Sequence, residues 1–248
     1  MRSRNRIVIA AAGGGKTTRI ADEVLADKSA RSAIVTYTRN NVREIQAKFY
    51  QRGLTIPQHV EIIPWYTFLL RELARPYRNY KYEKRIDGIF WTETTVDRFA
   101  PKADVGRYYF GNSSTIYSNR LAEFICDCNA ASGGAIFQRL EQRFKRVYID
   151  EIQDIAGYDI DIIELLLRSS LEVVLVGDPR QSTYVTNNSA RHKGFRGRTS
   201  SRNLGNGTRR NWRPWNTWLK PTAATNRSQT SPTVSIPPTR KRSRKTRN

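Results

Sequence analysis

The fold of this chain is decided at residues 6–18, which read Arg6-Ile7-Val8-Ile9-Ala10-Ala11-Ala12-Gly13-Gly14-Gly15-Lys16-Thr17-Thr18. The first four residues have the apolar character of a short strand, and the apolar residues of 19–25 recur at helical spacing. A strand, a glycine-rich turn and a helix start are the context that a phosphate-binding loop requires. Small residues let backbone N–H groups surround an anion at the positive end of a helix. The sequence therefore predicts a phosphate-binding loop.

Two side chains of this loop have the chemistry to bind a nucleotide. Lys16 would reach the terminal phosphates, and the hydroxyl of Thr17 would ligate Mg²⁺. Ala10 stands where the general pattern has its first glycine, so a glycine-rich turn that caps a helix is the alternative. The residues expected to bind the nucleotide are Ala12, Gly13, Gly14, Gly15, Lys16, Thr17 and Thr18.

Paired carboxylates follow a second apolar segment at residues 146–154, which read Arg-Val-Tyr-Ile-Asp-Glu-Ile-Gln-Asp. A parallel sheet presents its ligand-binding edge where its strands end. There Asp150 would hold Mg²⁺ through water, and Glu151 would polarise the attacking water. A solvated acidic strand end is the alternative. It does not explain a third apolar run at 171–176, which leads into Gly-Asp-Pro-Arg-Gln-Ser-Thr-Tyr at 177–184.

Three motifs in this order resemble motifs I, II and III of UvrD/Rep-type superfamily 1 helicases. They are Ala-x-Ala-Gly-x-Gly-Lys-Thr at 10–17, Asp-Glu-x-Gln-Asp at 150–154 and Gly-Asp-Pro-x-Gln-Ser-x-Tyr at 177–184. Segments 33–45 and 65–71 resemble motifs Ia and Ib. The resemblance covers roughly residues 6–188. It implies an α/β fold, a RecA-like P-loop NTPase with a parallel sheet, and a nucleic-acid-stimulated ATPase that uses ATP and Mg²⁺.

The resemblance also implies roles for individual residues. Glu151 would be the catalytic base, Asp150 and Thr17 would hold the metal, and Gln181 matches the glutamine that senses the γ-phosphate. Gln153 and Asp154 match positions of motif II that couple the site to its neighbours. The residues implied to bind single-stranded DNA, or RNA, are Tyr37, Thr38, Thr67, Phe68 and Tyr184. Bases stack on the two tyrosines in this interpretation, and half-buried core aromatics are the alternative.

The chain also departs from the family pattern. No glutamine precedes Ala10 to read adenine, and Thr186 replaces the aromatic often found two residues after the motif III tyrosine. Nothing after Tyr184 resembles motifs IV, V or VI, which in the family belong to a second RecA-like domain that supplies arginine fingers. We therefore expect a partner chain to be needed for that domain, and no directional unwinding from this chain alone.

Positive charge is concentrated at the carboxyl end. All 22 acidic residues lie at or before Asp178, whereas residues 179–248 contain 17 of the 43 Lys and Arg residues. Such a segment cannot bury enough apolar area to offset the entropy of ordering. We predict a RecA-like domain over 1–188, with an insertion at about 76–135, and a disordered, basic, low-complexity tail over 189–248. The abrupt shift in composition predicts a truncated helicase, in which a change of reading frame ends the native sequence near residues 194–200. A basic nucleic-acid-binding arm is the alternative.

Two function classes remain. The first is the ATP-hydrolysing core of a UvrD-like DNA helicase acting on single-stranded DNA. The second is a non-motor nucleic-acid-binding protein that keeps the fold, uses its basic tail and does not turn over ATP on its own. A P-loop kinase is disfavoured by the order of the motifs. Cys126 and Cys128 have the wrong spacing for a zinc site, and no apolar run reaches membrane-spanning length. We expect a cytoplasmic protein.

Overall fold

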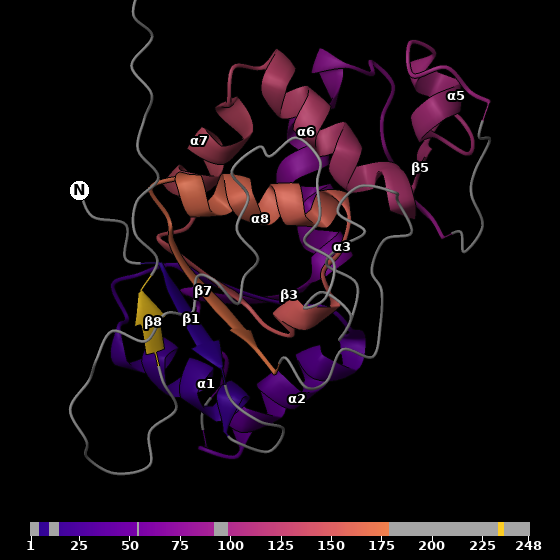
Figure 1. Cartoon of the computed structure of the whole chain (residues 1–248). Helices are drawn as coiled ribbons and strands as arrows, with labels where there is room; N and C mark the ends of the chain where they lie inside the picture. The colour runs from indigo at the N-terminus through magenta and orange to yellow at the C-terminus, as the bar shows by residue number, and fades with distance from the viewer. Residues whose placement is uncertain (1–4, 10–14, 54, 92–98, 179–232, 236–248) are drawn as a thin grey trace, which may run out of the picture.

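A computed structural model of the chain describes residues 5–9, 15–53, 55–91, 99–178 and 233–235 (Figure 1). Its centre is a six-stranded sheet in the order β3-β2-β6-β7-β1-β8. The strands of this sheet are β1 (Arg6–Ile9), β2 (Ser32–Thr36), β3 (Val60–Pro64), β6 (Arg146–Ile149), β7 (Glu172–Gly177) and β8 (Thr233–Ser235). All pairs are parallel except that of β8, which runs antiparallel to β1 at the edge. The predicted RecA-like α/β sheet is confirmed.

Helices cover both faces of the sheet. Figure 1 shows α1 (Lys16–Ala26) and α2 (Arg39–Tyr50) on one side, with α6 (Leu121–Ala131), α7 (Ala135–Arg143) and α8 (Tyr158–Arg168) on the other. The latter side also holds α3 (Trp65–Phe68), the π-helix η1 (Leu69–Ala74), α4 (Arg75–Tyr77) and the 3-10 turn η2 (Arg78–Tyr80). Two further short 3-10 turns are η3 (Ser118–Arg120) and η4 (Ile152–Asp154).

The alternation of side chains along the strands divides the core between these two layers. Within β2, Ala33 and Val35 pack in the cluster that includes α6, α7 and α8, whereas Ile34 packs in the cluster with α1 and α2. All five residues of β2 are buried. A parallel strand covered on both faces requires such a continuous run of buried residues.

The interval predicted as an insertion shares this core. It contains a two-stranded parallel sheet of β4 (Gly88–Phe90) and β5 (Thr115–Tyr117), together with α5 (Val105–Tyr109). The buried side chains of Ile86, Tyr109 and Ile116 belong to the same cluster as Val35 of the central sheet. The described part of the interval therefore packs as an extension of one layer.

The helical spacing of the apolar residues predicts helices at 135–144 and 160–167, and these are observed as α7 and α8. Strand β8 was not predicted, because it lies in the basic segment that the composition assigns to a tail. Within the described residues, none of the helices combines the length and the apolar character needed to cross a bilayer.

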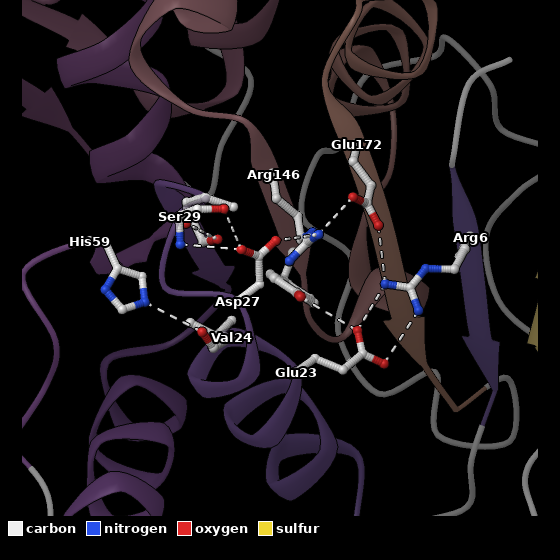
Figure 2. Close-up of polar contacts among 11 residues, drawn as sticks. Arg6, Glu23, Val24, Asp27, Ser29, His59, Arg146 and Glu172 are labelled. Carbon is white, nitrogen blue, oxygen red and sulfur yellow. Dashed lines mark hydrogen bonds and ion pairs between the residues drawn. The ribbon is translucent and has the colours of Figure 1, made fainter. Parts of the chain in front are cut away.

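Charged side chains form a network where the strands begin (Figure 2). Arg6 pairs with Glu23 at 2.8 Å and with Glu172 at 3.3 Å, and Arg146 pairs with Glu172 at 2.9 Å and with Asp27 at 3.4 Å. Burial would raise the pKa of Glu23, but hydrogen bonds and charge from Arg6 and Arg19 outweigh it and hold this pKa below its usual range. Because Arg6, Arg146 and Glu172 each begin a strand, the network lies at the sheet edge opposite the phosphate loop. It ties α1 to the sheet.

Candidate nucleotide site

The phosphate loop ends where α1 begins. Gly15 has φ of 73°, in the left-handed region that favours glycine, and its carbonyl accepts the N–H of Arg19 at 2.9 Å. Among the described residues no side chain caps the amino end of α1, and no acidic residue lies in its first turn. The first turn of a helix has N–H groups without intrahelical partners and carries positive partial charge, which favours an anion. Ala12, Gly13 and Gly14 lie outside the described residues.

Lys16 places its ammonium group inside this edge of the sheet. The residue is only 9% exposed, and its Nζ has no hydrogen-bond partner within the described residues. The group is 3.5 Å from Oε1 of Glu151, which follows β6. A buried ammonium without hydrogen bonds is costly. Phosphate oxygens would supply acceptors here, so the residues present fit a nucleotide. Thr17 and Thr18 lie half-buried in the same turn.

Asp150 follows the last residue of β6 and is 5% exposed. Its N–H donates to the carbonyl of Val35 at 2.9 Å, which holds it against β2. Burial, and then the negative charge of Glu151, raise the pKa of Asp150 to about 7. A hard divalent cation prefers carboxylate oxygen and would stabilise the ionised form. Asp150 therefore fits a magnesium ligand.

Glu151 is the only non-glycine residue with positive φ among those that the structure describes, at φ 56° and ψ 45°. A left-handed conformation costs an ordinary residue roughly 1–2 kcal/mol. Its N–H donates to Oδ1 of Asp150 at 3.0 Å. Backbone strain of this kind gathers at functional sites, and here it falls on the predicted catalytic base.

Gln153 joins this base to the end of β7. Its Nε2 donates to Oε2 of Glu151, and its Oε1 accepts the N–H of Asp178 at 3.1 Å. A Cβ atom on Gly177 would lie 2.6 Å from the same Oε1. The glycine therefore permits the close approach on which this bridge depends.

The residues predicted to bind nucleic acid differ in their exposure and in their contacts. Tyr37 follows β2 and is half-buried, and its ring centroid lies 6.0 Å from that of Tyr66. Thr67 is exposed. Thr38 caps α2, because its hydroxyl accepts the N–H of Asn41 at 3.1 Å.

The prediction for Phe68 is wrong. Its side chain is 0% exposed and stacks on Trp65 in the core, so its ring offers no face to a base. Gln181 and Tyr184 lie outside the described residues.

Residues 1–187 match the family described as AAA domain. The chain belongs to this AAA domain family. It is also similar to a curated protein, "Gabija protein GajB" of Bacillus cereus (strain VD045), with 28% identity over 199 residues. That alignment covers 73% of the chain and 38% of the relative, so the chain spans well under half of the relative's length.

Two features of this AAA domain were not predicted from its sequence. The positive φ of Glu151 has no local signal, because glutamate disfavours that region. Tyr66 lies beside the predicted Thr67 and Phe68, and its ring reaches both Tyr37 and Trp91. Aromatic residues crowd that segment, and a helical wheel over 65–68 would have separated Tyr66 from Phe68.

Proposed function

We propose that this AAA domain is the ATP-hydrolysing core of a UvrD-like helicase that uses Mg²⁺ and acts on single-stranded DNA. The observation that carries the proposal is the meeting of Lys16, Asp150 and Glu151 at the carboxyl ends of β1 and β6. A buried cation and two carboxylates at the mouth of a phosphate loop match the needs of phosphoryl transfer, which depends on positioning and charge.

Each group has a distinct task in this proposal. Lys16 would neutralise the terminal phosphates, and Thr17 with Asp150 would hold Mg²⁺. Mg²⁺ held there would offset the negative charge of the terminal phosphates. Glu151 would orient the attacking water, and the Nε2 group of Gln153 would hold the glutamate in place.

The same bridge gives the nucleotide site a route to the nucleic acid. Gln153 contacts the N–H of Asp178, and Asp178 leads into the segment predicted to sense the γ-phosphate. Tyr37, at the end of the neighbouring β2, would stack a base. We expect slow hydrolysis by this chain alone, and faster hydrolysis with a partner chain that supplies an arginine.

ATP hydrolysis by the full chain, measured with and without oligothymidylate at moderate salt, tests the proposal. We expect detectable turnover that the oligonucleotide increases. Heparin is the control, because residues 179–248 carry 17 basic residues and bind any polyanion at low salt. Oligouridylate in a parallel series tests RNA. Tight oligonucleotide binding without any turnover would favour the non-motor alternative.

A further inference from the structure

Two consecutive aromatic side chains at the end of β4 are exposed to solvent. Phe90 is 50% exposed and Trp91 is 64% exposed. Most large apolar side chains of the described residues are buried, as expected for a folded domain. An adjacent pair of exposed aromatic rings is the kind of surface feature that marks a binding site.

The Trp91 ring is held in place by a row of tyrosines. Its centroid lies 4.7 Å from that of Tyr66, with the planes at 76°, and Tyr66 lies 6.0 Å from Tyr37 with the planes at 56°. The hydroxyl groups of the two tyrosines share a hydrogen bond. The three rings therefore form a continuous row from the carboxyl end of β2 out to the end of β4.

Phe90 is oriented in a similar way. Its ring meets that of Tyr117 on the neighbouring β5 at 5.8 Å and 87°. Edge contacts of this kind fix a ring while much of its surface remains accessible. Rings fixed in this way lose little conformational freedom when a ligand stacks on them.

Basic side chains precede this aromatic pair along the chain. Lys81 and Lys84 are exposed; Arg85 is exposed too, but it pairs with the exposed Asp87 at 2.9 Å, and Glu83 is a second exposed carboxylate. Arg75 anchors the segment by donating to the carbonyl groups of Ile86 and Asp87. At the rise of an extended strand, Lys84 lies within about 25 Å of Trp91. Exposed aromatic rings that share a segment with exposed lysines suit a chain of bases joined by phosphates.

We propose that Trp91 is an additional base-stacking residue, which extends the single-strand path from Tyr37 over Tyr66 to the end of β4. The ligand is an unpaired nucleobase of single-stranded DNA or RNA. This inference rests on the nucleic-acid binding in the proposed function. Continuity with Tyr37 and the exposed ammonium groups of Lys81 and Lys84 favour a nucleic acid over a protein partner at this surface.

Binding of an oligothymidylate of about 16 nucleotides to the full chain at moderate salt tests the proposal. We expect Trp91→Ala to weaken binding about five- to hundred-fold, and Trp91→Phe to keep most of the affinity. Tyr50→Ala is the matched control, because Tyr50 is 58% exposed at the far end of α2. Thermal melting of each variant checks that the fold is intact. We expect Trp91→Ala to fold normally, because the Trp91 side chain is exposed.

Tryptophan fluorescence gives a second readout. We expect the oligonucleotide to quench the parent more than Trp91→Phe, because both proteins keep the other four tryptophans. If Trp91→Ala binds the oligonucleotide as tightly as the parent while Tyr37→Ala binds more weakly, the role of Trp91 is overturned and the proposed function stands. The surface around Trp91 would then suit a protein partner. Unchanged binding in both variants would contradict the proposed function itself.

Discussion

Nζ of Lys16 lies 3.5 Å from Oε1 of Glu151. The lysine begins α1 and the glutamate follows β6, so the pair joins the phosphate loop to the predicted catalytic base across the sheet edge. A phosphate bound to Lys16 would compete with Glu151 for the ammonium group. Nucleotide binding would then release the glutamate toward water.

Substitutions of Lys16 and Glu151 should affect different steps. Lys16→Ala should abolish nucleotide binding because it removes the buried cation, whereas Glu151→Gln should keep binding and stop turnover. A fluorescent ATP analogue measures the binding, and phosphate release measures the turnover. Lys28→Ala, at an exposed lysine just beyond the other end of α1, is the control. Normal binding by Lys16→Ala would show that the site is assigned wrongly.

The affinity for Mg²⁺–nucleotide should depend on pH. Burial, and then the charge of Glu151, raise the pKa of Asp150 to about 7, so this carboxyl is largely protonated at pH 6 and largely ionised at pH 8. Protonation removes the metal ligand, and affinity should therefore fall as the pH drops through 7. Titration calorimetry at several pH values checks this. Asp150→Asn should bind Mg²⁺–nucleotide weakly, with an affinity that changes little with pH. A pH-independent affinity in the parent would contradict the assignment of Asp150 as a metal ligand.

The same carboxyl should lower the stability of the protein without nucleotide at high pH. Its pKa in the folded state, about 7, exceeds the ordinary value of 3.8. The folded state then holds a proton that the unfolded state loses, so the free energy of unfolding falls as the pH rises between these values. Asp150→Asn should be more stable than the parent at pH 8, by up to a few kcal/mol, and nearly equal to it at pH 3.5. Denaturant unfolding in EDTA measures the difference.

Gly177→Ala should damage the site by steric means. The new Cβ would lie 2.6 Å from both Oε1 of Gln153 and Cγ2 of Ile152, so the bridge to Glu151 must shift. We expect a loss of about 1–3 kcal/mol in stability and a larger proportional loss of turnover. Gly88→Ala is the matched control, because the nearest atom to its Cβ would be 3.9 Å away. Equal turnover in the two variants would remove Gln153 from the mechanism.

Glu72→Gln should destabilise the fold. The carboxylate is 1% exposed in η1 and pairs with Nε of Arg71 at 2.6 Å, Nε of Arg143 at 3.2 Å and Nη1 of Arg139 at 3.6 Å. The three arginines are partly exposed, so we expect the free energy of unfolding to fall by about 1–3 kcal/mol, which is less than for a fully buried pair. Chemical denaturation measures this, with Glu83→Gln at an exposed glutamate as the control. If Glu72→Gln leaves the free energy of unfolding unchanged, water screens the charges of Glu72 and the three arginines.

The sequence by itself determined the architecture and indicated the chemical groups of the candidate site. Small residues before Lys16, an apolar run such as that of β7 and paired carboxylates after β6 are local patterns, and each follows from backbone geometry or strand burial. The predicted helices before β6 and β7 rest on helical spacing in the same way. The unpredicted edge strand β8 has no such pattern.

Only the tertiary structure decided which neighbouring side chains face the site. Phe68 and Tyr66 are two residues apart, yet packing of α3 and η1 against the core buries the first and brings the second to Tyr37 and Trp91. The bridge from Glu151 through Gln153 to Asp178 needs the close approach at Gly177. Burial and the neighbouring charge of Glu151 set the pKa of Asp150. These properties depend on atoms brought together from distant parts of the chain, which local sequence patterns do not encode.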